Sequence, residues 1–179
     1  WSYIDIHGNW TSPWIRSTAG LTDVAHKNGV TVGCLMSIPY GNTVYPSSWS
    51  FDNYGKILYK LYQKKGGKFI NAEPLVRMMK YYGINGIGFN SEFKTSSEIM
   101  SQLSEFFVAC HKEAEKLNWK FEVHWYDGTG DDGRIHFDGG LGNHNQKIFG
   151  NKDNIATDML FANYNWGPSH LRGSVSTAQ

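Results

Sequence analysis

The sequence predicts an α/β fold, a partial (β/α)8 TIM barrel in which about five parallel strands of the eight are present. Apolar strand-like segments alternate along the chain with segments of helical periodicity, an order typical of parallel strands joined by helical crossovers. An open sheet that binds a nucleotide would carry a glycine-rich phosphate loop after a strand. The sequence Gly86-Ile87-Gly88 instead lies inside a predicted strand, which favours the barrel.

The individual elements follow from hydrophobic periodicity and from residues that begin or end helices. Residues 30–38 are almost continuously apolar, as expected for a strand covered on both faces. Gly29 and Gly83 are placed to end helices, and Pro74 is placed to begin one. The predicted strands are 3–7, 30–38, 84–92, 120–127 and 158–165, and the predicted helices are 21–28, 52–63, 74–82 and 95–117.

One face of each helix is expected to pack on the sheet. Thr95 and Glu98 predict a capping box at the start of the last helix. Its apolar residues then recur at spacings of three and four, namely Ile99, Leu103, Phe106, Phe107, Cys110, Ala114 and Leu117. The inward residues expected for two earlier helices are Leu21, Val24 and Ala25, and Leu75, Met78, Met79 and Tyr82.

The chain of 179 residues is expected to form a single domain that is an internal portion of a barrel. Five-eighths of a barrel would leave two open edges and a half-exposed core. The expected partners are therefore the remainder of the barrel and any accessory domains of the same parent chain. Residues 167–179 are expected to be a frayed tail or linker, and the chain is not expected to fold alone as a monomer.

Composition and charge exclude several classes of partner. The formal net charge is +1, which argues against nucleic acid, and no apolar run approaches the roughly 20 residues of a membrane span. Cys34 and Cys110 are expected to be buried packing residues, and two cysteines do not fix the compartment. Aromatic residues in polar loops suit a sugar-binding cleft or else fold back onto the core: Trp10, Trp14, Tyr40, Tyr45, Trp49 and Trp166.

The predicted strand at 84–92 carries the first candidate site. Ile87 and Phe89 share an apolar face, and the opposite face carries two glycines followed by Asn90 and Glu92 at the C-terminal tip. Active sites of (β/α)8 barrels collect at the C-terminal ends of the strands. Glu92 is therefore the candidate general acid, with Asn90 beside it. The alternative is that the two residues are a structural hydrogen-bonded pair that caps the strand.

The next strand, 120–127, adds polar residues to the same region. Its polar face carries Glu122, His124 and Tyr126, and Tyr126 is expected to emerge at the same rim as Asn90 and Glu92. These last three residues are expected to surround one pocket. His124 is expected to be a hydrogen-bonding residue rather than a metal ligand, and no metal or organic cofactor is expected.

Glycoside hydrolases commonly use two carboxylates, and a second one is not well placed here. Glu122 lies four residues deeper, roughly 13 Å along the strand, and Asp127 alternates to the other face. Asn90 cannot be a nucleophile, but its amide can orient one that the substrate supplies, such as a 2-acetamido oxygen. The sequence therefore favours substrate-assisted cleavage next to an N-acetylated sugar.

Motifs over most of the chain, from Trp1 to about Trp166, resemble the family 85 endo-β-N-acetylglucosaminidases, which cut the chitobiose core of N-glycans. The most specific of them is Asn-x-Glu after Tyr-Tyr-Gly, with Trp-Tyr-Asp one strand later. The matching segments are Trp1-Ser2-Tyr3-Ile4-Asp5, Asp23-Val24-Ala25-His26-Lys27-Asn28-Gly29-Val30, Lys80-Tyr81-Tyr82-Gly83, Asn90-Ser91-Glu92, Trp125-Tyr126-Asp127 and Asp132-Gly133.

This resemblance implies retaining hydrolysis of the GlcNAc-β1,4-GlcNAc bond in N-glycans or glycoproteins. Glu92 would be the general acid and then the general base, Asn90 would hold the acetamido group as an oxazolinium ion forms, and Tyr126 would contact that group. Phe137 stands where the family pattern has Trp, which puts acceptor binding and transglycosylation in question. The residues implied for substrate binding are Trp125, Asp127, Phe137, Trp166 and His124.

Two other functions stay open at this point. One is a two-carboxylate, chitinase-like glycosidase that uses Asp127 or Glu122. The other is a barrel that binds glycans without cutting them. The first predicts that loss of Asp127 costs more activity than loss of Asn90, and the second predicts binding without turnover.

Overall fold

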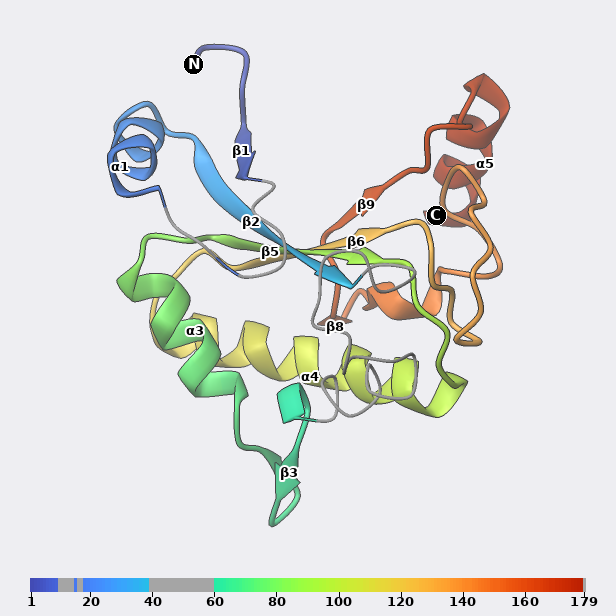
Figure 1. Cartoon of the computed structure of the whole chain (residues 1–179), viewed down its shortest axis with the longest axis horizontal. Coiled ribbons are helices and arrows are strands. Elements are labelled where there is room, and N and C mark those ends of the chain that lie inside the picture. Colours follow the sequence, from blue (N-terminus) through green and yellow to red (C-terminus); the bar gives the residue numbers. More distant parts are fainter. Residues whose placement is uncertain (10–14, 16–17, 39–59, 179) are drawn as a thin grey trace, which may run out of the picture.

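The computed structural model describes residues 1–9, 15, 18–38 and 60–178 (Figure 1). Its centre is a parallel sheet of five strands in the order β1-β2-β5-β6-β9. These strands are β1 Ile6–Asn9, β2 Thr31–Ile38, β5 Gly86–Ser91, β6 Glu122–Tyr126 and β9 Met159–Phe161. The predicted partial barrel is confirmed, because the five strands form a curled half-barrel with helical crossovers.

Helices and short hairpins complete the described chain. The helices are α1 Ala19–Lys27, α3 Ala72–Tyr81, α4 Ser97–Lys116 and α5 Pro168–Ala178, with a 3-10 turn η1 at Lys147–Phe149. The hairpins pair β3 Lys64–Lys65 with β4 Lys68–Phe69, and β7 Gly150–Asn151 with β8 Asn154–Ile155. In the described part of the chain, no helix combines the length and the apolar character needed to cross a membrane.

Two predictions fall largely outside the described residues. Most of the helix expected at 52–63 lies there, and so do five of the six loop aromatics, Trp10, Trp14, Tyr40, Tyr45 and Trp49. The sixth, Trp166, is described and is 53% exposed.

The core lies between the sheet and the helices α3 and α4, which run along one face of it (Figure 1). Phe89 of β5, Trp125 of β6 and Phe107 of α4 form a ring cluster with centroids 5.2 to 6.2 Å apart. All three are at most 1% exposed. The predicted alternation along β5 and β6 is therefore confirmed: one face of each strand fills the core, and the other is left for the site.

The buried faces of two helices agree with the expected ones only in part, because Ala25 and Met79 are buried as expected but other residues are not. In α1 the buried residues are Thr22 and Ala25, whereas Leu21 and Val24 are exposed. The helix α3 begins at Ala72 rather than Pro74, and it buries Ala72, Val76 and Met79 while Met78 and Tyr82 are exposed. Residues at spacings of three and four share one stripe of a helix, and several such stripes exist on each helix. The sheet packs against a stripe next to the expected one, and spacing alone does not tell the two apart.

The start of α4 also differs by one residue from the expected capping box. Ser96 is the N-cap, and its Oγ accepts a hydrogen bond from the Ile99 amide at 3.3 Å. The Thr95 amide instead donates to the Gly133 carbonyl at 2.8 Å, which ties the helix start to the loop after β6.

The C-terminal segment is not frayed as expected but forms α5. Ser174 of this helix accepts a hydrogen bond from the Leu141 amide at 2.8 Å and donates one to the His170 carbonyl. Since these bonds connect α5 to the loop after β6, the helix is tied to the same region as the predicted site. Serine and glycine content alone had suggested a tail.

The C-terminal ends of β5 and β6 are locked together by backbone and hydroxyl contacts. Ser91 Oγ donates to the Tyr126 carbonyl at 2.8 Å, and the Thr129 amide donates to the Ser91 carbonyl at 2.8 Å. Gly128 passes so close to Ser91 that a Cβ atom at this position would overlap the Ser91 carbonyl oxygen. These contacts hold the backbone next to Glu92 in place.

We expect Gly128→Ala to destabilise the protein by about 1–3 kcal/mol, because the added methyl group meets backbone rather than a flexible side chain. The matched control is Gly142→Ala in the same loop region, where a Cβ meets nothing within 4 Å. Chemical denaturation of both variants checks this. Equal stability of the two would contradict the close packing at Gly128.

Candidate active site

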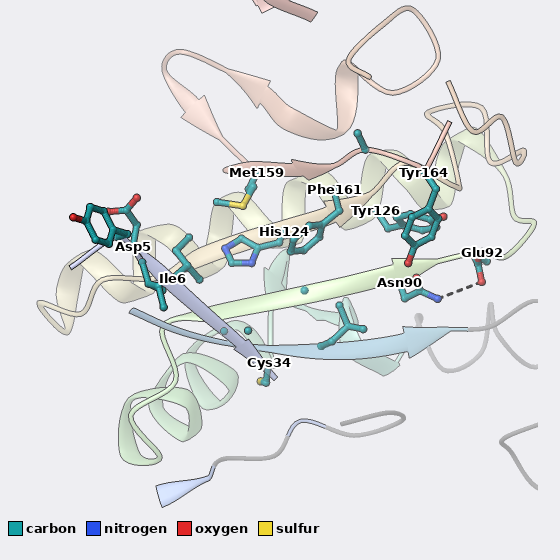
Figure 2. Close-up of a pocket in the computed structure, with 17 residues that line it drawn as sticks. Asp5, Ile6, Cys34, Asn90, Glu92, His124, Tyr126, Met159, Phe161 and Tyr164 are labelled. Atoms are coloured by element: carbon teal, nitrogen blue, oxygen red, sulfur yellow. Dashed lines mark hydrogen bonds between the residues drawn. The ribbon is translucent and has the colours of Figure 1, made fainter. Parts of the chain in front are cut away.

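A pocket of about 820 Å³ lies on the face of the sheet opposite α3 and α4 (Figure 2). Its walls come from the strands β1, β2, β5, β6 and β9 or from residues next to them. Asn90, Glu92, Tyr126 and Tyr164 gather at one end of this pocket, and Asp5 lies at the other end. The crowded end is the C-terminal end of the strands, where parallel α/β folds place their ligands.

Asn90 and Glu92 point to the same side from the end of β5, as the alternation of the strand requires. The Asn90 amide nitrogen donates to Glu92 Oε2 at 3.3 Å. Asn90 is 8% exposed, whereas Glu92 is half-buried and reaches the pocket. Among the described residues no group donates to the amide oxygen of Asn90. The pair therefore presents one carboxylate and one free amide oxygen to the pocket.

Tyr126 lies at the same end, one strand over from the pair. Its hydroxyl donates to Asn163 Oδ1 at 2.8 Å, and its ring lies 6.1 Å from the ring of Phe137. Burial raises the pKa of the Tyr126 hydroxyl, and the negative charge of Glu92 raises it further. The hydroxyl is therefore protonated at neutral pH.

Asp127 does not line the pocket but anchors the segments around it. The side chain is 2% exposed and accepts hydrogen bonds from the Gly139 amide, from Asn145 Nδ2 at 2.9 Å and from the Asn163 amide at 3.5 Å. Burial raises the pKa of Asp127, while these hydrogen bonds oppose the increase. The alternation along β6 turns Asp127 away from Tyr126, so its contribution is to hold the loop and the strand end.

Of the other residues expected to bind substrate, His124 lines the pocket and Trp125 does not. His124 is 3% exposed, and its Nε2 lies 3.3 Å from Glu122 Oε2. The ring fits because Gly86 has no side chain, since a Cβ there would meet it at 2.7 Å. Trp125 is fully buried on the core side, where its indole N–H donates to the Thr129 carbonyl at 3.0 Å.

Phe137 and Trp166 lie outside the pocket lining. Phe137 is half-buried beside Tyr126, and its φ of 55° places it in the left-handed region. Trp166 is half-exposed in the turn that precedes α5. The structure thus brings the Phe137 ring next to Tyr126, whereas Trp166 reaches the site only through its backbone amide, which donates to the Asn163 carbonyl at 3.1 Å.

Sequence reasoning missed Asn163 and Tyr164. Tyr164 lines the pocket and is 91% exposed, and Asn163 accepts the hydrogen bond from Tyr126. Both were included in a strand expected to run to residue 165, but β9 ends at Phe161. With the strand end placed at Phe161, the rule that sites follow the C-terminal ends of strands would have found both residues.

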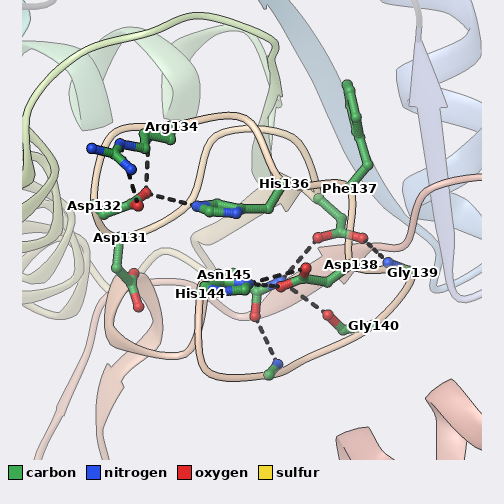
Figure 3. A network of polar contacts seen from close by, with 12 residues as sticks. Asp131, Asp132, Arg134, His136, Phe137, Asp138, Gly139, Gly140, His144 and Asn145 are labelled. Carbon is green, nitrogen blue, oxygen red and sulfur yellow. Dashed lines mark hydrogen bonds and ion pairs between the residues drawn. The ribbon is translucent and has the colours of Figure 1, made fainter.

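Three side chains in the loop after β6 bring possible metal-binding atoms within 4.8 Å of one another: His136, Asp138 and His144 (Figure 3). The two imidazole rings are stacked, with centroids 4.0 Å apart and planes 7° apart. Nitrogen lone pairs lie in the ring planes, so two stacked rings do not aim at one ion. His136 also bonds to Asp132 at 2.9 Å and His144 to Asp138 at 3.0 Å. We assign no metal to this cluster.

We expect Asp127→Ala to cost about 2–4 kcal/mol of stability, because two buried N–H groups and one half-buried N–H group lose this acceptor. The matched control is Asp138→Ala in the same loop, where a half-exposed carboxylate pairs with the exposed His144 and about 0–1 kcal/mol is expected. Denaturant titration measures both. A loss at Asp138 as large as that at Asp127 would disagree with the anchoring role.

The chain is similar to known proteins in both sequence and fold. All of it, residues 1–179, matches Glycosyl hydrolase family 85. It is 28% identical over 178 residues to a protein of Gallus gallus described as a cytosolic endo-beta-N-acetylglucosaminidase, and the match covers 96% of this chain. It is also similar to the glycoside hydrolase domain of Endo-D from Streptococcus pneumoniae R6, with a TM-score of 0.74 and 27% identity over 88% of this chain.

The chain spans only part of these relatives, 22% of the Gallus gallus protein and 24% of the Endo-D chain. The match to the family nevertheless includes the strands β1 to β9 and the strand ends that carry Asn90, Glu92 and Tyr126. The chain belongs to glycosyl hydrolase family 85.

Proposed function

We propose that this chain carries the catalytic site of an endo-β-N-acetylglucosaminidase that cuts the GlcNAc-β1,4-GlcNAc bond in the core of N-linked glycans. The proposed reaction is retaining and substrate-assisted. The observation that carries it is the Asn90–Glu92 pair, one carboxylate and one amide at the crowded end of the pocket. The names of the two relatives support the substrate class.

In the first step, Glu92 donates its proton to the glycosidic oxygen as the bond from that oxygen to C1 breaks. The carbonyl oxygen of the substrate's 2-acetamido group attacks C1 from the opposite face, and a cyclic oxazolinium ion forms. The Asn90 amide orients the acetamido group, and its oxygen stabilises the positive charge that develops on that group. The leaving sugar departs with the proton from Glu92.

In the second step, the Glu92 carboxylate takes a proton from water, and the resulting hydroxide oxygen attacks C1. The ring of the oxazolinium ion opens, and the acetamide is restored. Two inversions at C1 give net retention, and Glu92 ends protonated, ready for the next cycle.

The positions of the other carboxylates argue against a two-carboxylate mechanism. Glu122 is paired in register with Gly86, six residues before Glu92, which corresponds to about 20 Å along the strands. It is also held by Lys120 at 2.8 Å and by His124. Asp127 is buried and accepts three hydrogen bonds, and Asp5 lies at the far end of the pocket.

We also propose that further βα units close the barrel. The edge strands β1 and β9 each pair on one side only among the described residues. Phe161 on the edge strand β9, and Leu21 and Val24 on α1, the helix that follows the edge strand β1 in the chain, are exposed apolar residues. Three more strands with their helices would cover the edges and complete the eight-stranded sheet.

We expect Glu92→Gln to lower kcat by about 10³-fold or more, because the amide cannot donate the proton that the leaving oxygen needs. The assay is release of glycan from a high-mannose glycopeptide by the protein expressed from its complete reading frame. Glu98→Gln, an exposed glutamate in the first turn of α4, is the control and should retain full activity. Glycan that binds to the wild type without being cut would favour the non-catalytic barrel instead.

We expect the 2-acetamido group on the non-reducing side of the scissile bond to be indispensable, because it supplies the nucleophile. A substrate analogue with a hydroxyl group at that position should not be turned over, and Asn90→Ala should lower kcat on the natural substrate by about 10²-fold. The control variant is Asn151→Ala in the β7–β8 hairpin. Turnover of the hydroxyl analogue, or a larger loss for Glu122→Gln than for Asn90→Ala, would refute substrate assistance.

A further inference from the structure

Tyr126 has a single hydroxyl proton, and this proton is already engaged. Its Oη donates to Asn163 Oδ1 at 2.8 Å. A phenol has one O–H donor and two acceptor lone pairs. Toward the pocket, the Tyr126 oxygen can therefore only accept a hydrogen bond.

Asn163 is held in place by the same anchor that holds the end of β6. Its backbone N–H donates to Asp127 Oδ2 at 3.5 Å, and its carbonyl accepts from the Trp166 amide at 3.1 Å. The Asp127 amide in turn donates to the Phe161 carbonyl at 2.9 Å. Tyr126 and Asn163 therefore sit on two neighbouring strand ends that share one buried carboxylate, so the bond between them is built into the fold.

The direction of this bond matters for an acetamide. The group has one N–H donor and one carbonyl oxygen, and the carbonyl oxygen must attack C1. A donor aimed at that oxygen would withdraw electron density from it, whereas an acceptor on the N–H pushes electron density toward it. An unoccupied lone pair on Tyr126 suits the N–H and favours the attack.

We propose that Asn163 is a positioning residue that takes the Tyr126 proton and thereby makes the Tyr126 oxygen an acceptor for the acetamide N–H. The inference rests on the proposed function and specifies how its site recognises the N-acetyl group. Without Asn163, the Tyr126 hydroxyl can turn toward Glu92, which lies at the same end of the pocket, or toward the acetamide oxygen. Either bond opposes the first step, because one occupies the general acid and the other weakens the nucleophile.

The test is a double-mutant cycle in the protein expressed from its complete reading frame, with kcat and KM measured on a high-mannose glycopeptide. We expect Asn163→Leu to lower kcat by roughly tenfold, with KM changed by less than about threefold, because the lost effect belongs to the transition state. In a Tyr126→Phe background, Asn163→Leu should change kcat by less than about twofold. Asn163→Asp keeps an acceptor oxygen and should lose less than Asn163→Leu.

The matched control is Asn165, two residues further along, whose Nδ2 donates to the Phe137 carbonyl at 3.3 Å rather than to Tyr126. Any decrease in kcat caused by Asn165→Leu should be the same factor in the wild-type and Tyr126→Phe backgrounds. If Asn163→Leu also costs the same in both backgrounds, Asn163 acts by another route and the inference is overturned.

A measurement in the free protein separates this inference from the proposed function. With the tyrosines labelled by 13C at Cζ, the Tyr126 resonance is the one that is lost in Tyr126→Phe. It should shift in Asn163→Leu and shift less in Asn163→Asp. An unmoved resonance overturns the inference whether or not glycan is released. If the resonance shifts as expected but the protein releases no glycan, the proposed function is rejected. The role of Tyr126 toward the acetamide is then rejected as well, while the Tyr126–Asn163 hydrogen bond is supported.

Discussion

The buried carboxylate of Asp127 holds together the parts of the molecule on which the site depends. It accepts hydrogen bonds from Gly139 and Asn145 in the loop after β6 and from Asn163 after β9. These segments are far apart in sequence. Because a buried carboxylate needs its donors, each segment is fixed relative to the others, and Tyr126, one residue before Asp127, is fixed with them.

A second constraint acts on the opposite side of the same strand end. The Ser91–Gly128–Thr129 contacts hold the tip of β5 against the tip of β6, with Thr129 Oγ1 also donating to the Phe93 carbonyl at 2.7 Å. Glu92 lies between Ser91 and Phe93, so its backbone is held on both sides. The Asn90–Glu92 pair thus stands on backbone that these contacts hold in place, and Tyr126 beside it comes from the end of β6.

Alternation made the strands and the principal site residues predictable. Asn90, Glu92, His124 and Tyr126 line the pocket because each lies on the polar side of a strand whose other side is core. A period of two leaves few alternatives once one face is apolar. The positions of strand ends were not predictable in the same way, and the misplaced end of β9 concealed Asn163 and Tyr164.

Helix faces and long-range hydrogen bonds were also beyond sequence reasoning. Leu21 and Val24 have the spacing of an inward face, yet Thr22 and Ala25 are buried, because the sheet meets a neighbouring stripe of α1. The helix α5 has no buried residue and is linked to the loop after β6 through Ser174. No local sequence pattern predicts this contact. The anchoring role of Asp127 likewise depends on partners 12 to 36 residues away.

The order of strands in the sheet, β1-β2-β5-β6-β9, is also their order along the chain. Each of these strands pairs with the one made just before it, so the sheet can lengthen at its newest edge while the polypeptide is being synthesised. No strand has to be inserted between two that are already paired. The loop closed at each addition is one crossover long, which keeps the entropic cost of every step small. The two halves of the site, on β5 and β6, are brought together in consecutive steps of that growth.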